Sequence, residues 1–218
     1  NEIIGYACYA KDLAIKTSRN VKALISKTRS NLTEIIYADI FPNTKLKRGH
    51  NTVQEWALEG RFLSFKTTSV EAQITGTGVT IRISDDLISG YRDALNENAK
   101  NIVWDWWTGT YISRRGSSKV IDIMCMTRWA SDDPCGRVLK IEPDNWHVIN
   151  LPIEKNGLML CDEILSYVNL QNIKLLQPED VFFANYYQEP VDIKNRVFNP
   201  KFYYDYQLAN IHKWEQLI

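Results

Sequence analysis

The sequence lacks several features that mark specialised classes of protein. No apolar run approaches the roughly 20 residues that a membrane-spanning helix needs, and no signal peptide is visible. Lys and Arg together number 26, as do Asp and Glu, so the chain has no net charge with which to attract a polyanion. This balance argues against a dedicated, strongly basic nucleic-acid-binding domain, although it allows DNA contact through one local patch.

Cysteine is sparse and scattered. The four cysteines are Cys8, Cys125, Cys135 and Cys161, no two of which form a CxxC pair, and the three histidines are not clustered. A zinc site and a disulfide scaffold both need closer or more numerous ligands than this. We therefore expect reduced thiols in a soluble intracellular protein.

What is present is the balance of an ordinary globular domain. The 218 residues are 44% hydrophobic and 24% charged, which is enough for one sizeable domain, or for a domain plus a tail. Apolar periodicity predicts strands that alternate with helices. The strands are expected at residues 3–8, 52–58, 61–67, 79–84, 119–126 and 146–151, and the helices at residues 11–26, 32–40, 93–111, 132–140 and 178–187. This alternation predicts an α/β fold with a mostly parallel sheet and flanking helices.

Both ends of the chain depart from this pattern. Asn1 leads directly into the apolar run at residues 3–8, and a natural N-terminus rarely opens inside a buried strand, so we expect further sequence upstream. From Glu189 onward the chain is aromatic and interrupted by proline. We therefore interpret residues 189–218 as a linker or strap.

Ligands in parallel sheets bind beyond the carboxyl ends of strands, and this rule selects two places. The first is Asp85-Asp86, where one carboxylate could hold Mg²⁺ through water and the other could orient an attacking water. The second is Thr127, which could sense the γ-phosphate of a nucleotide. Both places have simpler interpretations, because acid pairs and threonines also end strands as turn or cap residues.

A run of motifs resembles the large terminase subunit of tailed phages and prophages. The segment from Met126 to Leu139, MTRWASDDPCGRVL, resembles the family's MTRWHEDDLAGRLL. Residues 9–14 resemble SYSxDLA, and residues 74–86 resemble LTGRGxxxLIIDDP. Residues 103–110 resemble VWDWFxGTL, and residues 186–190 resemble YQQxP. The resemblance covers nearly the whole chain, in order and at family-like spacing.

The resemblance implies a fold and a role. Residues 1–188 would form a P-loop NTPase-like terminase ATPase domain that is incomplete at its N-terminus. Residues 189–218 would lead toward a C-terminal nuclease domain beyond these residues. The family's motor uses ATP and Mg²⁺ to drive double-stranded viral DNA into a procapsid. It works with a portal protein and a small terminase subunit, as a homo-oligomer at the portal in the host cytoplasm, without a membrane.

The resemblance also implies roles for individual residues. Asp85 would be the metal-associated acid, Asp86 the catalytic carboxylate, and Thr127 the residue that couples hydrolysis to movement. The nucleotide-binding residues, placed by the same motifs, would be Gly76, Gly78 and Arg128. Arg128 has an alternative interpretation, as a structural ion pair with Asp132 or Asp133.

The sequence departs from the family's pattern in ways that keep other functions open. It contains no G-K-[ST] loop, and Thr77 replaces the family's arginine between two glycines. Because that loop supplies the phosphate cradle, we expect the isolated chain to bind ATP weakly or not at all. One alternative is an inactive prophage remnant or interaction module. Another is a metal-dependent nuclease, which would need Asp122, Asp132 or Asp133 to converge on the acid pair.

Aromatic and basic clusters favour simple interpretations. Trp104 and Trp107 lie three residues apart on one helical face, as core residues do, whereas Trp106 falls on another face and is expected to be more exposed. The basic clusters at residues 45–48 and 114–115 are interpreted as solvated loops, with contact to a DNA backbone as the alternative.

Overall fold

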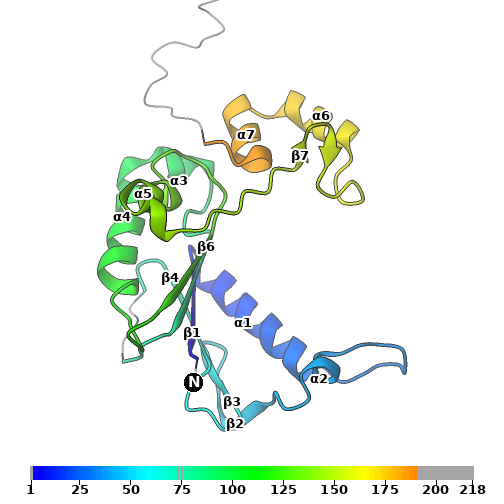
Figure 1. Cartoon of the computed structure of the whole chain (residues 1–218), viewed down its shortest axis with the longest axis vertical. Coiled ribbons are helices and arrows are strands. Elements are labelled where there is room, and N and C mark those ends of the chain that lie inside the picture. The colour runs from blue at the N-terminus through cyan, green and yellow to red at the C-terminus, as the bar shows by residue number, and fades with distance from the viewer. Residues whose placement is uncertain (1, 73, 75, 191–218) are drawn as a thin grey trace, which may run out of the picture.

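A six-stranded sheet with helices on both faces forms the body of the protein (Figure 1). The computed structural model describes residues 2–72, 74 and 76–190. The strands are β1 (Ile4–Cys8), β2 (Leu46–Asn51), β3 (Glu55–Leu58), β4 (Phe65–Ser69), β5 (Ile81–Asp85) and β6 (Ile121–Cys125). They lie in the order β2-β3-β4-β1-β5-β6. Strands β4, β1, β5 and β6 run parallel to one another, and β3 pairs antiparallel with both β2 and β4. The predicted α/β fold with a mostly parallel sheet is confirmed.

Helix α1 (Lys11–Ser26) covers one face of the sheet and has the predicted bounds. Its apolar side packs over β1, β3 and β4, where Tyr6, Trp56 and Phe65 are buried. The buried hydroxyl of Ser18 accepts a hydrogen bond of 3.0 Å from Trp56 Nε1, which satisfies a polar group that burial would otherwise leave unpaired. The following helix is much shorter than predicted. Of the expected residues 32–40, only Tyr37–Ile40 are helical, as α2.

The other face of the sheet is covered by a helical segment that breaks where one helix was predicted. The segment consists of α3 (Tyr91–Leu95), α4 (Glu97–Trp106) and the π-helical turn η1 (Trp107–Tyr111). The break falls at Asn96, whose side chain accepts from the backbone N–H groups of residues 98 and 99 and so caps α4.

The tryptophans of this segment belong to the core. Trp107 is buried and donates to Ser84 Oγ at 3.1 Å, and Trp104 stacks against Trp107, which confirms the core interpretation of this pair. The prediction that Trp106 is more exposed was wrong. Trp106 is 7% exposed, because its ring stacks on Tyr111 of the π-helical turn and its Nε1 donates to the backbone of Ala72.

The chain after β6 runs beyond the carboxyl ends of the strands (Figure 1). Helix α5 (Pro134–Ile141), which the turn η2 (Pro143–Asn145) follows, packs into the core of the body through Val138. Residues 153–190 form a smaller C-terminal lobe, which consists of the hairpin of β7 (Glu154–Lys155) and β8 (Leu158–Met159), α6 (Tyr167–Leu176) and α7 (Glu179–Tyr187). The strand predicted at residues 146–151 does not form. Residues 191–218, most of the predicted strap, lie outside the described residues. Among the described residues, no helix combines the length and the apolar character that a membrane crossing would require.

Candidate functional site at the carboxyl edge of β5 and β6

The acid pair and Thr127 lie together at one edge of the sheet. Asp85 ends β5 and is in register with Cys125, which ends β6. The backbone N–H of Asp86 donates to the Cys125 carbonyl at 2.9 Å, and the Thr127 N–H donates to Asp86 Oδ1 at 3.0 Å. Residues 41 positions apart in the sequence are therefore joined by the side chain of Asp86.

Asp86 adopts a backbone conformation that few residues other than glycine accept. Its φ is +40°, in the left-handed region, where aspartate is among the more tolerated side chains. The backbone of Asp86 is held from both sides, since its carbonyl accepts from the N–H of Tyr9 at 3.2 Å and its N–H donates to β6. Such outliers persist only where the surrounding structure fixes them, and they cluster at functional sites.

The Asp85 carboxylate has different surroundings, on the face of the sheet that α1 covers. The hydroxyl of Tyr6 donates to Asp85 Oδ2 and also lies 3.3 Å from the hydroxyl of Thr17. Burial raises the pKa of Tyr6 above its usual range, and the hydrogen bond to Asp85 adds to this rise. Burial likewise raises the pKa of Cys8, which the charge of Asp85 reinforces. The two acids are therefore neighbours in sequence whose carboxylates occupy distinct environments.

A cavity of about 490 Å³ opens beside Asp86 and Thr127. The Thr127 hydroxyl makes no hydrogen bond to any residue that the structure describes, so it stays available to a ligand. One wall comes from the end of β6 and from α5, and the other from the extended segment at residues 146–151. The lining residues are Asp86, Met124, Cys125, Met126, Thr127, Arg128, Cys135, Val138, Leu139, Trp146, His147, Val148, Ile149, Asn150, Leu151 and Gln188.

Arg128 forms one of the two predicted ion pairs. Its Nε lies 3.0 Å from Asp133 Oδ2, and Asp133 is completely buried. Asp133 also caps α5, since its Oδ1 accepts from the Gly136 N–H at 2.8 Å. Burial raises the pKa of Asp133, although Arg128 and the Gly136 N–H both oppose this rise. Arg128 thus lines the cavity while its Nε is engaged in a structural contact.

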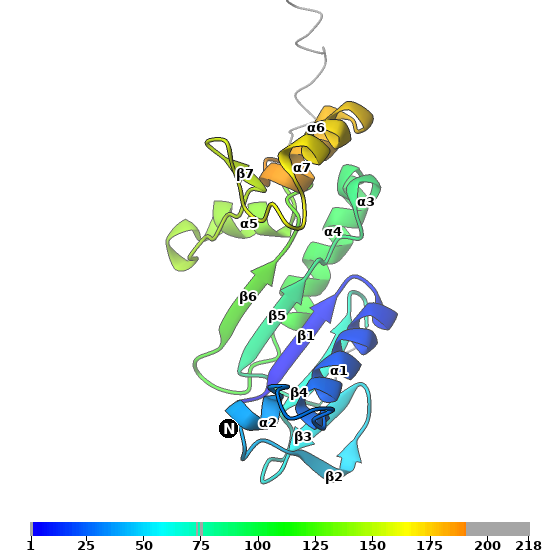
Figure 2. The same cartoon turned by 90° about the vertical axis from the view of Figure 1, so that its right-hand side faces the viewer.

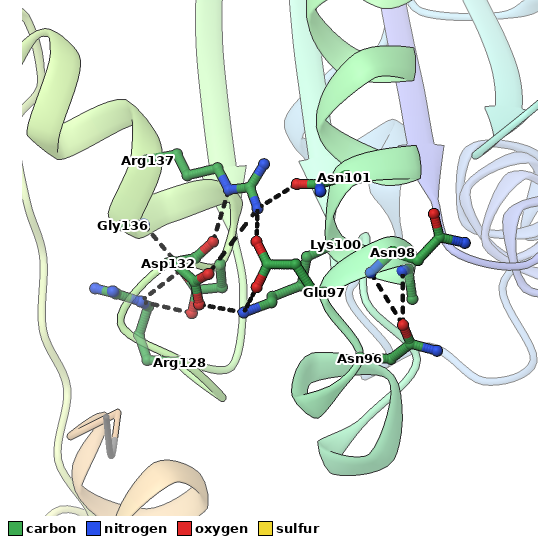
Figure 3. Close-up of polar contacts among 11 residues, drawn as sticks. Asn96, Glu97, Asn98, Lys100, Asn101, Arg128, Asp132, Gly136 and Arg137 are labelled. Atoms are coloured by element: carbon green, nitrogen blue, oxygen red, sulfur yellow. Dashed lines mark hydrogen bonds and ion pairs between the residues drawn. The ribbon is translucent and has the colours of Figure 1, made fainter. Parts of the chain in front are cut away.

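A second ionic network ties α4 to the start of α5 (Figure 3). The Lys100 ammonium, 4% exposed, pairs with Asp132 and lies 3.5 Å from Glu97. Arg137 donates to Asn101 Oδ1 at 2.7 Å and to the backbone carbonyl of Asp132 at 2.8 Å. The network therefore holds the turn after Thr127 against α4.

The two predicted nucleotide-binding glycines are not brought to this edge. Gly78 lies ahead of β5, at the opposite end of the strand from Asp85. A Cβ at Gly78 would come within 2.6 Å of the Arg115 carbonyl, so a close approach of two loops requires glycine there. Gly76, with φ of +75°, lies in the same connection from β4 to β5. The structure accounts for Gly78 through packing, without a ligand.

The carboxylates that a nuclease would need do not converge on the acid pair. Asp122 binds the buried Arg82 through two bonds of 2.6 Å, on the opposite face of the sheet from Asp85. Asp132 and Asp133 are held by Lys100 and Arg128. Within residues 2–72, 74 and 76–190, no three side chains of His, Cys, Asp or Glu group as metal ligands.

Asp85, Asp86 and Thr127 carry oxygen atoms of the kind that Mg²⁺ prefers. The Asp85 carboxylate, however, is bound by Tyr6 on the face that α1 covers, and it does not line the cavity beside Asp86 and Thr127. Phosphates need backbone N–H groups or free cations. Among the described residues that line the cavity, Arg128 is the only lysine or arginine, and its Nε is engaged with Asp133.

Sequence reasoning missed the contribution of Tyr6 and of the cavity wall. Tyr6 alternates with Cys8 on β1, but its proximity to Asp85 depends on β1 being the neighbour of β5, which periodicity does not give. Gln188, which lines the cavity and accepts from the Arg128 N–H at 3.4 Å, likewise comes from a distant helix end.

No protein-family model matches the chain, and no curated protein matches it.

Proposed function

We propose that this chain is part of the ATP-hydrolysing motor subunit of a phage terminase, which packages viral DNA into the procapsid. The observation that carries the proposal is the hydrogen bond from the Thr127 N–H to Asp86 Oδ1, which joins the ends of β5 and β6 beside a cavity. The ordered motifs that resemble the large terminase subunit, two of which contain Asp86 and Thr127, also support the proposal. Double-stranded DNA, the portal protein and the small terminase subunit are the partners that the proposal implies.

The proposal gives each residue at the edge a distinct task. Bound ATP with Mg²⁺ would supply the phosphoryl group whose hydrolysis drives movement. Asp85 would hold the metal through water, with its position fixed by the hydroxyl of Tyr6. Because Thr127 occupies Asp86 Oδ1, the other oxygen of Asp86 can accept a hydrogen bond from the attacking water. Thr127 would pass a change at the phosphate to the turn after β6.

Paramagnetic broadening in nuclear magnetic resonance tests this site. Because the chain has no G-K-[ST] loop, ATP is expected to bind weakly, so millimolar ATP with substoichiometric Mn²⁺ is the appropriate probe. The amide signals of Asp86 and Thr127 should broaden in the presence of ATP. The Asp85→Asn variant should lose this broadening, whereas the Asp144→Asn variant, changed at an exposed acid, should keep it. Equal broadening in both variants would place the metal elsewhere.

Two further measurements separate the motor from an inactive remnant. Titration calorimetry with Mg-ATP should show at most weak binding, and micromolar affinity would contradict the expected need for a separate phosphate cradle. The reading frame upstream of Asn1 should encode a G-K-[ST] loop. An upstream frame without this loop would favour the remnant or interaction module over the motor.

A further inference from the structure

The zero net charge of the chain conceals a segregation of charge along the sequence. Residues 11–66, from α1 to β4, contain eleven lysines and arginines but only five aspartates and glutamates. In the rest of the chain these numbers are fifteen and twenty-one, so an excess of six positive charges in one region is balanced by six negative charges elsewhere. Charge asymmetry of this kind indicates a polyanionic partner for the basic region.

Three of the five acids in the basic region pair with a neighbouring cation. The pairs are Lys27–Glu34, Arg29–Asp39 and Lys66–Glu55. The other eight cations form no ion pair with any described residue, and all of them except Lys22 and Lys47 are exposed. They are Lys11, Lys16, Arg19, Lys22, Lys45, Lys47, Arg48 and Arg61.

Contacts between α1, β2 and the β3–β4 connection join most of these cations into one basic band. Lys22 Nζ donates to the carbonyls of Asn51 and Thr52 at 3.1 Å, which places α1 beside the end of β2. Lys47 Nζ donates to the Arg61 carbonyl at 3.2 Å, which places β2 beside the β3–β4 connection. The basic band consists of Lys16, Arg19, Lys22, Lys47, Arg48 and Arg61. Strands β2 and β3 lie at the opposite end of the molecule from the C-terminal lobe (Figure 2).

An exposed aromatic ring accompanies the basic band. Phe62 follows Arg61 in the β3–β4 connection and is 83% exposed. Basic side chains on an edge strand discourage further strands from pairing with it, which accounts for Lys47 and Arg48 without a ligand. This protection accounts neither for the cations of α1 nor for the exposure of Phe62. Cations that follow phosphates and an aromatic ring on which a base stacks are the two parts of a surface that binds single-stranded nucleic acid.

We propose that the basic band binds single-stranded nucleic acid, with its cations along the phosphates and Phe62 stacked on an unpaired base. Charge complementarity selects this partner over the chain's own last residues, because residues 191–218 contain four cations and three acids. A second copy is a poorer complement, since acids elsewhere in the chain are held internally, as Asp122 is by Arg82. Binding at the band does not require the proposed function, whose DNA is double-stranded.

An anionic membrane is a less suitable partner than nucleic acid. Surfaces that bind membranes combine cations with several exposed apolar side chains. The loop after α1 exposes Leu32 and Ile35, but Glu34 lies 2.5 Å from Lys27 and Asp39 pairs with Arg29. The apolar loop is therefore locally neutral, and within the basic band Phe62 is the exposed apolar side chain.

Fluorescence anisotropy with a labelled oligothymidine of about 15 nucleotides tests the cations of the band. Raising NaCl from about 50 to about 200 mM should weaken binding about tenfold or more, because bound cations replace the counterions of the phosphates. The double variant Arg48→Gln/Arg61→Gln should weaken binding about tenfold by the same reasoning. The double variant Lys140→Gln/Lys155→Gln, which removes two exposed cations outside the band, should bind as the wild type does.

Variants of Phe62 distinguish a single strand from a duplex. Phe62→Ala should weaken binding of the oligothymidine about fivefold or more, and Phe62→Trp should restore it. Neither variant should change binding of a duplex of the same length, because paired bases cannot stack on the ring. Leu32→Ala is the matched control, since this side chain is 93% exposed outside the band, and it should bind both probes as the wild type does.

Five results would overturn the proposal. Unchanged oligothymidine binding in Phe62→Ala would make the band a general polyanion surface. Equal binding by the two double variants would place the nucleic acid elsewhere. Release of the oligothymidine by phosphatidylserine vesicles would favour a membrane. Self-association in sedimentation that Arg48→Gln/Arg61→Gln abolishes would make the band an interface between copies. Loss of binding in a longer chain that includes the expected upstream sequence would show that this sequence covers the band.

Discussion

At the scale of single residues, Tyr6 carries the contact that fixes Asp85. Its hydroxyl donates to the carboxylate from a side chain that is only 5% exposed. Tyr6→Phe removes this donor without changing the ring, and a hydrogen bond to a charged group contributes about 1.5–3 kcal/mol. We expect a loss of this size in the free energy of unfolding, measured by urea denaturation. Tyr9→Phe is the control, because Tyr9 is 42% exposed, and it should change stability by less than about 0.5 kcal/mol.

Asp133 gives a pH dependence with a defined sign. Burial raises its pKa in the folded protein above the usual value, so the folded state binds a proton there more readily than the unfolded chain does. This contribution to stability is present at low pH and is lost as pH rises through the folded pKa. Asp133→Asn keeps the cap on α5 but cannot ionise.

The comparison of wild type with Asp133→Asn isolates that contribution. The stability of wild type relative to the variant should rise as pH falls from 7 to 4, measured by urea denaturation at several pH values. A relative stability that falls over this range would mean that Arg128 outweighs burial. Asp133→Ala, which also removes the cap, should cost about 1 kcal/mol more than the asparagine variant at every pH.

At the scale of elements, the contact between α4 and α5 depends on Lys100 (Figure 3). Lys100→Met keeps most of the buried stem but leaves the carboxylates of Glu97 and Asp132 without the buried ammonium between them. Because Asp132 is partly exposed, we expect a loss of about 2–3 kcal/mol, below the cost of breaking a fully buried pair. Lys140→Met, on the exposed side of α5, is the matched control in denaturant unfolding. Equal losses in both variants would show that the network adds nothing to stability.

The elements that sequence predicted well are those that local periodicity determines. Helix α1 has the predicted bounds, because its apolar positions repeat at helical spacing over four turns. Strand β2 was missed, since a basic edge strand resembles a solvated loop. The strand predicted at residues 146–151 was wrong because a strand requires a partner, and these residues make no backbone hydrogen bond to any described residue. The helix predicted at residues 93–111 was divided by the capping side chain of Asn96.

At the scale of the whole molecule, sequence predicted which strand ends meet but not what surrounds them. The shared edge of Asp85, Asp86 and Thr127 follows from the rule that ligands lie beyond the carboxyl ends of parallel strands. The cavity could not be predicted, because its walls come from α5, residues 146–151 and Gln188, which only tertiary packing brings together. The place of Gly78 at the far end of β5 also depended on loop packing rather than on a motif.

The sheet and the C-terminal lobe (residues 153–190) should differ in stability. The lobe is thinly packed, since only Leu170, Phe182 and Ala184 of α6 and α7 are buried, and Leu175 and Leu176 are each 84% exposed. Regions with few buried apolar contacts open locally at a lower free energy than the core. Native-state hydrogen exchange should therefore give smaller opening free energies for amides of α6 and α7 than for those of β1.

Tyr91 provides the variant that tests whether the lobe opens on its own. Its hydroxyl donates from α3 to Asp180 at the start of α7, one of the polar contacts between the lobe and the body of the protein. Tyr91→Phe should lower the protection of α7 amides by about 1.5–3 kcal/mol, the usual contribution of a hydrogen bond to a charged group, and leave the protection of β1 amides unchanged. Equal loss in α7 and β1 would mean that the lobe and the sheet unfold as one cooperative unit. A selective loss in α7 would instead show that the cavity wall near Gln188 can move while the edge that carries Asp86 and Thr127 stays fixed.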